Sequence, residues 1–291
     1  KERIFEIKEV IKKADRQRFE AGAIIVDASK ANINPSTIGG IEGLIKTLVG
    51  NTNELTSQYN VRGGNYDENL VYVNDFEITR PFLVRSGQQE GLSFVNADLT
   101  SHVQFSVGGF QSKYGDKMSS VLDITYKKPK QFAGSASLSL LGGSLHLEGA
   151  SKNNKLTYLV GLRQKTNQYL LQAQPTKGVY NPTFTDVQTL INYKVNEQWE
   201  WEFLANYARN RFTFYPEEQT ASFGLVNKAY QLRMFYTGAE LDQFDTRFTG
   251  VSTTYRPNKN LRLKFLASAY ASNERETYDI SGEYLLGELE T

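Results

Sequence analysis

From Phe132 onward, apolar and polar residues alternate along the chain, and this pattern restricts the fold more than any other feature of the sequence. In the clearest segment, Trp201 and Phe203 share one face, and Glu200 and Glu202 share the other. Successive side chains of a strand point to opposite faces, so the pattern predicts antiparallel strands with one apolar and one polar face each. The seven alternating segments lie at 132–140, 144–148, 156–162, 187–195, 199–207, 244–255 and 261–270.

The connections between these segments also alternate. Tight polar turns are expected at 153–155, 196–198 and 258–260, and long connections at 167–186 and 216–242. Short turns on one side and long loops on the other are typical of a membrane barrel, whose strands of about 10 residues cross an apolar band of about 25 Å. Gly250 is expected to mark a bulge.

A soluble antiparallel sandwich would show a similar alternation. Two features favour the barrel. Several strands are longer than the five or six residues that are common in sheets. In addition, Trp199 and Trp201 lie beside a short turn, where a barrel carries its aromatic girdle. The opposite face carries Glu200, Glu202, Arg262 and Lys264, which suit a watery interior.

Composition excludes several classes of function. There is no cysteine, so disulfides, thiolate metal sites and cysteine nucleophiles are absent. The net charge is +1, which gives no general attraction to nucleic acid. His102 and His146 have no ligand spacing around them, so no metal site and no cofactor is expected. No catalytic arrangement is found, and the chain is not expected to be an enzyme.

Residues 21–128 read as a small mixed α/β unit. Strands are expected at 21–26, 70–73, 103–107 and 119–126, and an amphipathic helix from Ile38 to about Gly50. Before this unit, residues 1–19 fit a helix and an edge strand equally well. The unit contains two glycine pairs, Gly63-Gly64 and Gly108-Gly109, which permit positive φ or a close backbone approach.

Several pieces of this unit together resemble the plug domain of TonB-dependent outer-membrane receptors, in the form common in Bacteroidetes. The pieces are Tyr-Asn-Val-Arg-Gly-Gly at 59–64, Tyr-Asp-Glu-Asn-Leu-Val-Tyr-Val at 66–73, Gly-Gly-Phe-Gln-Ser-Lys-Tyr-Gly at 108–115 and Ser-Ser-Val-Leu-Asp-Ile at 119–124. The helix at 38–50 is similar to the plug helix of the family. The sequence departs from the family at Asn74-Asp75, where Asp-Gly is frequent, and at Asp116, where glycine is common.

The resemblance implies an α+β plug domain followed by an antiparallel transmembrane β-barrel. The expected organisation is an N-terminal arm at 1–20, the plug at 21–128 and the first part of the barrel at 129–291. A barrel of this family has about 22 strands, so the chain is expected to be a fragment that ends within the barrel.

The resemblance also implies a function, which is import of a bulky, scarce solute such as a glycan, a peptide or a metal chelate across the outer membrane of a Gram-negative cell. The implied partners are the TonB complex of the inner membrane, outer-membrane lipid, the transported solute and a surface lipoprotein, with no nucleic acid. Two alternatives stay open, which are a receptor-like component of a secretion or surface assembly that does not import, and a soluble β-rich binding module.

The resemblance implies two sets of site residues. The first is the plug motif, in which Arg62 either locks plug to barrel through carboxylates or only fixes its own turn. Its members are Arg62, Gly63, Gly64, Asp75, Gly108, Gly109, Tyr114 and Gly115. The second is a segment of the arm that could contact TonB, with Glu6, Ile7, Glu9 and Val10.

Overall fold

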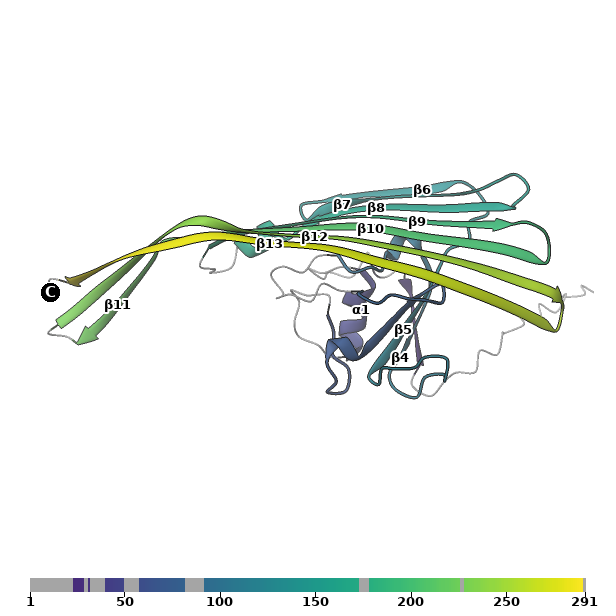
Figure 1. The fold of residues 1–291 in the computed structure, drawn as a ribbon, viewed down its shortest axis with the longest axis horizontal. Coiled ribbons are helices and arrows are strands. Elements are labelled where there is room, and N and C mark those ends of the chain that lie inside the picture. The colour runs from purple at the N-terminus through teal and green to yellow at the C-terminus, as the bar shows by residue number, and fades with distance from the viewer. Residues whose placement is uncertain are drawn as a thin grey trace, which may run out of the picture.

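The structure, a computed structural model, describes residues 23–28, 31, 40–49, 58–81, 92–172, 178–225 and 228–289. It contains a five-stranded sheet with one main helix, and an eight-stranded sheet that arches over it (Figure 1). In the part of the chain that is described, no helix is long and apolar enough to span a membrane.

The five-stranded sheet has the order β1-β4-β5-β2-β3. Strands β2 and β5 run parallel, and the other pairs are antiparallel. We call this sheet, with its helix and two 3-10 turns, the inner unit. Its elements are β1 (Ala23–Val26), α1 (Gly40–Val49), η2 (Tyr66–Glu68), β2 (Asn69–Val73), β3 (Phe76–Glu77), η3 (Ala97–Leu99), β4 (Thr100–Ser106) and β5 (Ser120–Tyr126).

The inner unit confirms the predicted strands and helix. The predicted helix is present as α1, and its first two predicted residues lie outside the described part. Its apolar residues recur at three- and four-residue spacing, so one stripe turns to the core, where Ile41 and Ile45 are fully buried. Tyr59 packs edge-to-face on Phe105 in the same core, with ring centroids 5.9 Å apart.

The eight-stranded sheet, which we call the outer sheet, is antiparallel throughout and has the order β11-β12-β10-β9-β8-β7-β6, with β13 paired to β12. Among the described residues, β6 and β13 each pair on one side only. The elements are β6 (Ala133–Ser139), β7 (Gly142–Ala150), β8 (Leu156–Thr166), α2 (Gln168–Gln172), β9 (Gly178–Lys194), β10 (Trp199–Pro216), β11 (Gln219–Leu225), β12 (Lys228–Asn258) and β13 (Leu261–Leu289).

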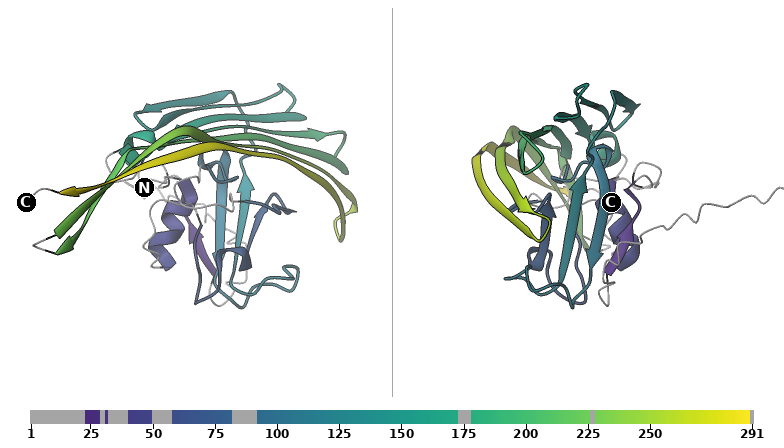
Figure 2. Two further views of the ribbon diagram at one scale, coloured as in Figure 1. Left: turned by 60° about the vertical axis from the view of Figure 1, so that its left-hand side comes forward. Right: turned by 90° about the vertical axis from the view of Figure 1, so that its right-hand side faces the viewer.

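Burial confirms the predicted faces of the central strands β8, β9 and β10. In β9 and β10, the polar face turns to the inner unit, and Gln188 and Leu204 are fully buried there. The apolar face points away from the inner unit, and Trp201 is 45% exposed and Tyr193 47% exposed. We call these the concave and the convex face of the outer sheet (Figure 2). The two sheets share a core in which Leu159, Leu190, Leu204 and Phe248 join the apolar residues of the inner unit.

The predicted long connections were wrong in large part. The stretch 167–186 contains α2 and the first half of β9, and the stretch 216–242 contains β11 and the first half of β12. The outer sheet therefore has eight strands instead of seven. Its long hairpin, β12 with β13, extends beyond the other strands and carries β11 at its far end (Figure 1).

The reason for this error lies in the side on which the apolar residues stand. The pairing of β12 with β13 runs without a shift from Ala229 to Tyr255, so Tyr230 and Leu232 point to the same face as Phe244. In the distal part of the hairpin, Tyr230 and Leu232 therefore stand on the concave side, whereas near the short turns Tyr193, Trp201 and Phe203 stand on the convex side. The alternation continues, but its sense is reversed.

The predicted bulge at Gly250 was also wrong. Gly250 pairs regularly with Leu204 and with Ser268, and the irregularity lies between Tyr255 and Asn258. The structure gives Gly250 a different role, which is described below.

Candidate functional site

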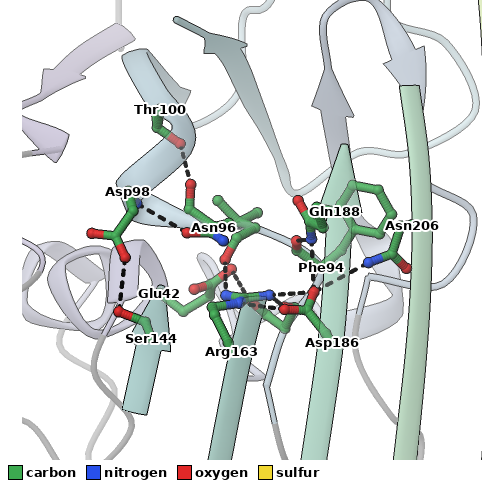
Figure 3. A network of polar contacts seen from close by, with 12 residues as sticks. Glu42, Phe94, Asn96, Asp98, Thr100, Ser144, Arg163, Asp186, Gln188 and Asn206 are labelled. Carbon is green, nitrogen blue, oxygen red and sulfur yellow. Dashed lines mark hydrogen bonds and ion pairs between the residues drawn. The ribbon is translucent and has the colours of Figure 1, made fainter. Parts of the chain in front are cut away.

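The contact between the inner unit and the concave face of the outer sheet carries the densest set of polar interactions. At its centre, the segment 92–99 of the inner unit lies against β8, β9 and β10 (Figure 3). Strand alternation places polar side chains of these three strands on the concave face, where they reach the backbone of the segment. We call this contact the docking site.

Arg163 of β8 is the main side chain of the docking site. Its Nε and Nη2 donate to Oδ1 and Oδ2 of Asp186 at 2.7 and 2.8 Å. Its Nη1 donates to the carbonyl of Val95 at 2.6 Å, and Nη2 also donates to the carbonyl of Ser93 at 2.8 Å. The planar fork of arginine suits such paired contacts. One guanidinium group therefore joins a buried carboxylate of the sheet to two carbonyls of the inner unit.

Asp186 and Gln188 of β9 extend the network. Oδ2 of Asp186 also accepts from Gln188 Nε2 at 2.9 Å and from Asn206 Nδ2 at 3.1 Å. Gln188 donates to the carbonyl of Phe94, and its Oε1 accepts from the Tyr126 hydroxyl at 2.6 Å. The buried carboxyl group of Asp186 thus accepts hydrogen bonds from three side chains, Arg163, Gln188 and Asn206, which satisfies both of its oxygens.

Glu42 connects helix α1 to the same segment. Its side chain is buried, and its Oε1 accepts from Ser93 Oγ at 2.6 Å. Burial raises the pKa of Glu42 above its ordinary value of 4.5, although the hydrogen bond from Ser93 and the charge of Arg163 act in the opposite direction. Figure 3 shows the Glu42 carboxyl group close to the Arg163 guanidinium.

Two glycines of the outer sheet make room for the inner unit. A Cβ at Gly161 would lie 2.6 Å from Asn96 Nδ2, and a Cβ at Gly250 would lie 2.9 Å from the Phe76 ring. Phe76 in turn packs edge-to-face on Phe248 of β12, with ring centroids 6.3 Å apart. These strands need glycine because the inner unit approaches their backbone closely.

Further ion pairs join the two parts away from the centre. Lys264 of β13 contacts Asp75 at 2.5 Å, Lys128 contacts Glu200 of β10 at 2.7 Å, and Arg80 contacts Glu274 of β13. Partial burial opposes ionisation of Asp75, but the hydrogen bond and the charge of Lys264 outweigh it, so the pKa of Asp75 is lowered.

The structure places the side chain of Arg62 beside the second predicted glycine pair. Arg62, with φ 50°, and Gly63, with φ 81°, form a turn, and Gly108 and Gly109 have φ 69° and 62°. A Cβ at Gly108 would lie 3.2 Å from Nη1 of Arg62, so this arginine stands beside the second pair. Arg62 itself is exposed. Its role as a lock to barrel carboxylates stays a prediction.

The remaining members of the predicted motif are spread over the inner unit. A Cβ at Gly64 would clash with Ser119 Oγ at 1.9 Å, so only glycine fits there. Tyr114 is buried, donates to Asp123 and packs on Tyr72 with ring centroids 5.1 Å apart. A Cβ at Gly115 would meet nothing within 4 Å. Among the described residues, Asp75 is the member of the motif that forms an ion pair with the outer sheet, through Lys264.

The predicted TonB-contacting residues Glu6, Ile7, Glu9 and Val10 lie outside the described residues. Of the two histidines, His146 is buried on the concave face, where its Nε2 lies 3.0 Å from Oε2 of Glu148 and its Nδ1 lies 3.3 Å from Ser135 Oγ. Within the described ranges, no three His, Asp or Glu side chains gather in a way that could hold a metal ion.

Arg163 and Asp186 are the docking residues that the sequence reading missed. A signal was present, because each is a charged residue on the polar face of a strand. Their pairing depends on strand register, which sets Arg163 directly opposite Asp186 in β8 and β9. The docking site contains hydrogen-bonding and charged groups that hold two parts of the chain together, and its geometry serves attachment.

No protein-family model and no curated protein matches the chain. Among solved structures, the chain is similar to the siderophore receptor PirA from Pseudomonas aeruginosa, at 13% identity and a TM-score of 0.47 over 92% of this chain and 56% of that chain. It is also similar to PirA from Acinetobacter baumannii, at 10% identity and a TM-score of 0.48 over 88% and 48%.

A third similar structure is the outer membrane transporter YddB from Escherichia coli, at 8% identity and a TM-score of 0.47 over 92% of this chain and 53% of that chain. The chain spans about half the length of these solved chains. The similarity is one of fold, to two siderophore receptors and an outer membrane transporter.

Proposed function

We propose that the chain is the plug domain and the first barrel strands of a TonB-dependent outer-membrane receptor that imports a bulky, scarce solute. In this proposal, the inner unit is the plug and the outer sheet is the beginning of the barrel wall. The free edges of β6 and β13 pair with further strands. The N-terminal arm, with Glu6, Ile7, Glu9 and Val10, contacts TonB.

One observation carries this proposal, which is the distribution of side chains over the two faces of the outer sheet. The face covered by the inner unit carries most of the buried polar and charged side chains of the sheet beside a few apolar ones, whereas the open face carries Leu145, Tyr193, Trp201, Phe203 and Phe265, all exposed. A soluble sheet that packs on a domain buries its apolar face. The reverse arrangement is expected when lipid covers the open face.

The polar character of the docking site supports the plug assignment. Because Arg163 and Gln188 hold the inner unit through hydrogen bonds, water can replace these contacts if the inner unit moves. A plug that rearranges to admit a solute needs a contact of this kind. Arg62, beside the paired glycines, is proposed to add a lock between plug and barrel.

The membrane part of the proposal is tested on the full-length parent protein by cell fractionation and heat-modifiability. We expect a band in the outer membrane that changes its electrophoretic mobility after boiling, because a closed barrel resists detergent until it is heated. A soluble protein without a mobility change would contradict the barrel and support a soluble binding module.

The transport part is tested by deleting residues 1–20 and following uptake of candidate glycans, peptides and metal chelates. We expect uptake to be lost while the heat-modifiable band remains, because the arm is proposed to receive the energy for import. Unchanged uptake would contradict TonB coupling through this arm. A parent barrel that imports none of the candidates would favour the non-importing assembly component.

A further inference from the structure

The side chains on the convex face of the outer sheet change from apolar to charged along the strands. In β10, Trp201, Phe203 and Ala205 stand on this face, and the paired positions of β9, β12 and β13 carry no charged side chain there in the described part of the chain. Tyr207 is the next convex residue of β10, about 26 Å along the strand from Trp199 at about 3.3 Å per residue. This length is close to the apolar band of about 25 Å that a membrane strand crosses.

From the row of Tyr207 onward, arginines stand on this face. Arg247 of β12 pairs with Tyr207. Further along β12, Gln243 pairs with Arg211 on one side and with Arg275 of β13 on the other. The pairing of β10 with β12 runs without a shift from Trp199 to Phe214, so strand alternation keeps these side chains on the convex face. We call this patch the arginine cluster, and its members are Arg209, Arg211, Arg247 and Arg275.

The positive charge of the arginine cluster is largely unneutralised. Asp245 is the anionic residue that faces the cluster among the described residues, and its Oδ1 lies 2.6 Å from Nε of Arg209. The other three arginines are exposed and form no ion pair in the part of the chain that the structure describes. Like charges on neighbouring strands repel each other, and an anion between them would remove the repulsion.

Arg211 offers free hydrogen-bond donors beside a groove. Its Nε donates to Gln243 Oε1 at 3.1 Å, whereas its Nη1 and Nη2 groups form no hydrogen bond with a described residue. A groove of about 350 Å³ lies next to them, and its lining includes Arg211, Arg275 and Leu241. The planar fork of arginine pairs with two phosphate oxygens at once. The groove therefore combines donors for a phosphate with an apolar side chain.

Tyr207 indicates where a membrane surface would meet this face. The guanidinium groups of Arg209 and Arg247 lie 5.8 and 6.0 Å from the centre of its ring. Its hydroxyl donates to Asp245 Oδ1 at 2.9 Å. A tyrosine between an apolar surface and charged groups is typical of the level of the lipid headgroups. Since Trp199 and Trp201 stand near the short turns, the arginine cluster lies at the opposite edge of the apolar band.

We propose that the arginine cluster binds the phosphate groups of an anionic lipid headgroup, with Arg211 and Arg275 as the main ligands. This inference rests on the proposed function, because it uses the membrane position of the outer sheet. The short turns of a membrane barrel face the periplasm, so this lipid belongs to the outer leaflet. The occupant is a lipid because the cluster directly continues the apolar band on the same face, where acyl chains and headgroup of one molecule can bind together.

The test uses the full-length protein purified in detergent and native mass spectrometry. Bisphosphorylated lipid A, lipid A without its phosphates and inorganic phosphate are titrated separately, because lipid A is an anionic lipid of the outer leaflet. We expect bisphosphorylated lipid A to bind most tightly, and the double variant R211Q/R275Q to lower its affinity on the order of tenfold, since two charge-assisted contacts are lost. The control K155Q/K194Q removes the same charge from exposed lysines near the short turns, on the concave face. It should change the affinity by less than about twofold.

Three results would overturn the proposal. These are equal binding of lipid A with and without its phosphates, equal losses in the two double variants, or inorganic phosphate binding as tightly as bisphosphorylated lipid A, which would indicate a site for free anions. Retention of the heat-modifiable band shows that the variants fold. A heat-modifiable outer-membrane protein without preference for the phosphorylated lipid would refute the lipid site alone, whereas a soluble protein would refute the proposed function.

Discussion

At the scale of single residues, the ion pair of Arg163 with Asp186 is the interaction whose loss should matter most. The carboxylate of Asp186 is 3% exposed, and the guanidinium group also holds two carbonyls of the inner unit. Replacement of Arg163 by alanine leaves a buried charge without its partner. We expect Arg163→Ala to lower the free energy of inner-unit docking by about 3–5 kcal/mol, measured by pulse proteolysis in urea on the detergent-solubilised protein.

The chain offers a control in the pair of Arg209 with Asp245 on neighbouring strands, in which the Arg209 side chain is 44% exposed. Water reaches this guanidinium group, and Asp245 keeps hydrogen bonds from Tyr207 and Gln243, so Arg209→Ala should leave the urea midpoint almost unchanged. The double variant R163A/D186A should lose less docking free energy than R163A alone, because it also removes the carboxylate that R163A leaves without a partner. If R163A and R209A lowered the docking free energy by similar amounts, burial would not be the reason that the Arg163–Asp186 pair is important.

Glu42 gives the inner unit a dependence on pH. Because burial raises the pKa of Glu42, the folded state holds the proton more tightly than the unfolded chain does. The stabilisation is therefore fully present below the ordinary pKa of 4.5 and is lost as the pH rises through the higher folded value. We expect the urea midpoint of inner-unit docking to fall between pH 4 and pH 8 by more in the wild type than in Glu42→Gln.

The same pH series measured on Ser93→Ala separates the effect of burial on the pKa of Glu42 from the effect of its hydrogen bond. Ser93 Oγ donates to Glu42, and this bond favours the ionised form. Its loss should make the fall of the midpoint with pH steeper. An identical pH dependence in the wild type and in Glu42→Gln would mean that another group controls it.

At the scale of elements, the side on which residues stand was predictable from the sequence, whereas their partners were not. Alternation in 199–207 correctly assigned Trp201 to the open face and Glu202 to the covered one, because the period of a strand is fixed by backbone geometry. The pairing of Arg163 with Asp186 depends on register between two strands, which no single segment encodes. The sequence alone therefore could not distinguish the docking residues from the other polar residues on the same strand faces.

The distal half of the long hairpin shows a second limit of sequence reading. Tyr230 and Leu232 alternate regularly with Gln231 and Arg233, which fits the strand that the structure shows there in place of the predicted long connection. If lipid covers the convex face near the short turns, as proposed, the distal convex face meets water instead, and there the physical reason for an apolar convex face disappears. A rule that assigns the apolar residues of a strand to one face of the sheet therefore fails where the surroundings of that face change along the strand.

Gly250 allows a test of how closely strand β12 approaches the inner unit. Its Cβ position lies 2.9 Å from the Phe76 ring, so a larger side chain must displace this ring. We expect Gly250→Val to weaken docking by about 1–3 kcal/mol through overpacking, measured by the same pulse proteolysis. In the control Gly282→Val, the added Cβ would lie 3.3 Å from the half-buried ring of Tyr236, and β-branched residues favour strands. If the two valine variants weakened docking equally, Gly250 would not be needed for the close approach of β12 to Phe76.

At the scale of the whole molecule, the proposed function requires that one face of the outer sheet lies in lipid over part of its height and in water beyond it. Strand β12 has 31 residues, which at about 3.3 Å each gives about 100 Å. This length far exceeds an apolar band of about 25 Å. The short-turn end, with its aromatic residues, must therefore be the membrane part, and the distal hairpin with β11 must project from it.

Phe203 and Leu241 stand on the convex face on either side of this proposed boundary, and they provide the decisive comparison. Phe203 is 38% exposed and lies a few residues from a short turn, whereas Leu241 is 50% exposed in the distal hairpin. If lipid covers Phe203, Phe203→Arg should destabilise the assembled protein by about 2–4 kcal/mol, because arginine is costly near the middle of the bilayer. Leu241→Arg should change stability by less than about 0.5 kcal/mol, as for a surface residue in water.

The two arginine variants are compared by urea unfolding in phospholipid vesicles and by the heat-modifiable fraction in cells. A soluble sheet would place both side chains in water, and both substitutions would then be tolerated equally. Equal tolerance would contradict the membrane assignment even if the docking site behaved as predicted. A large loss for Phe203→Arg alone would fix the height at which the sheet leaves the membrane, and it would place the reversal of the apolar face in the distal hairpin outside the lipid.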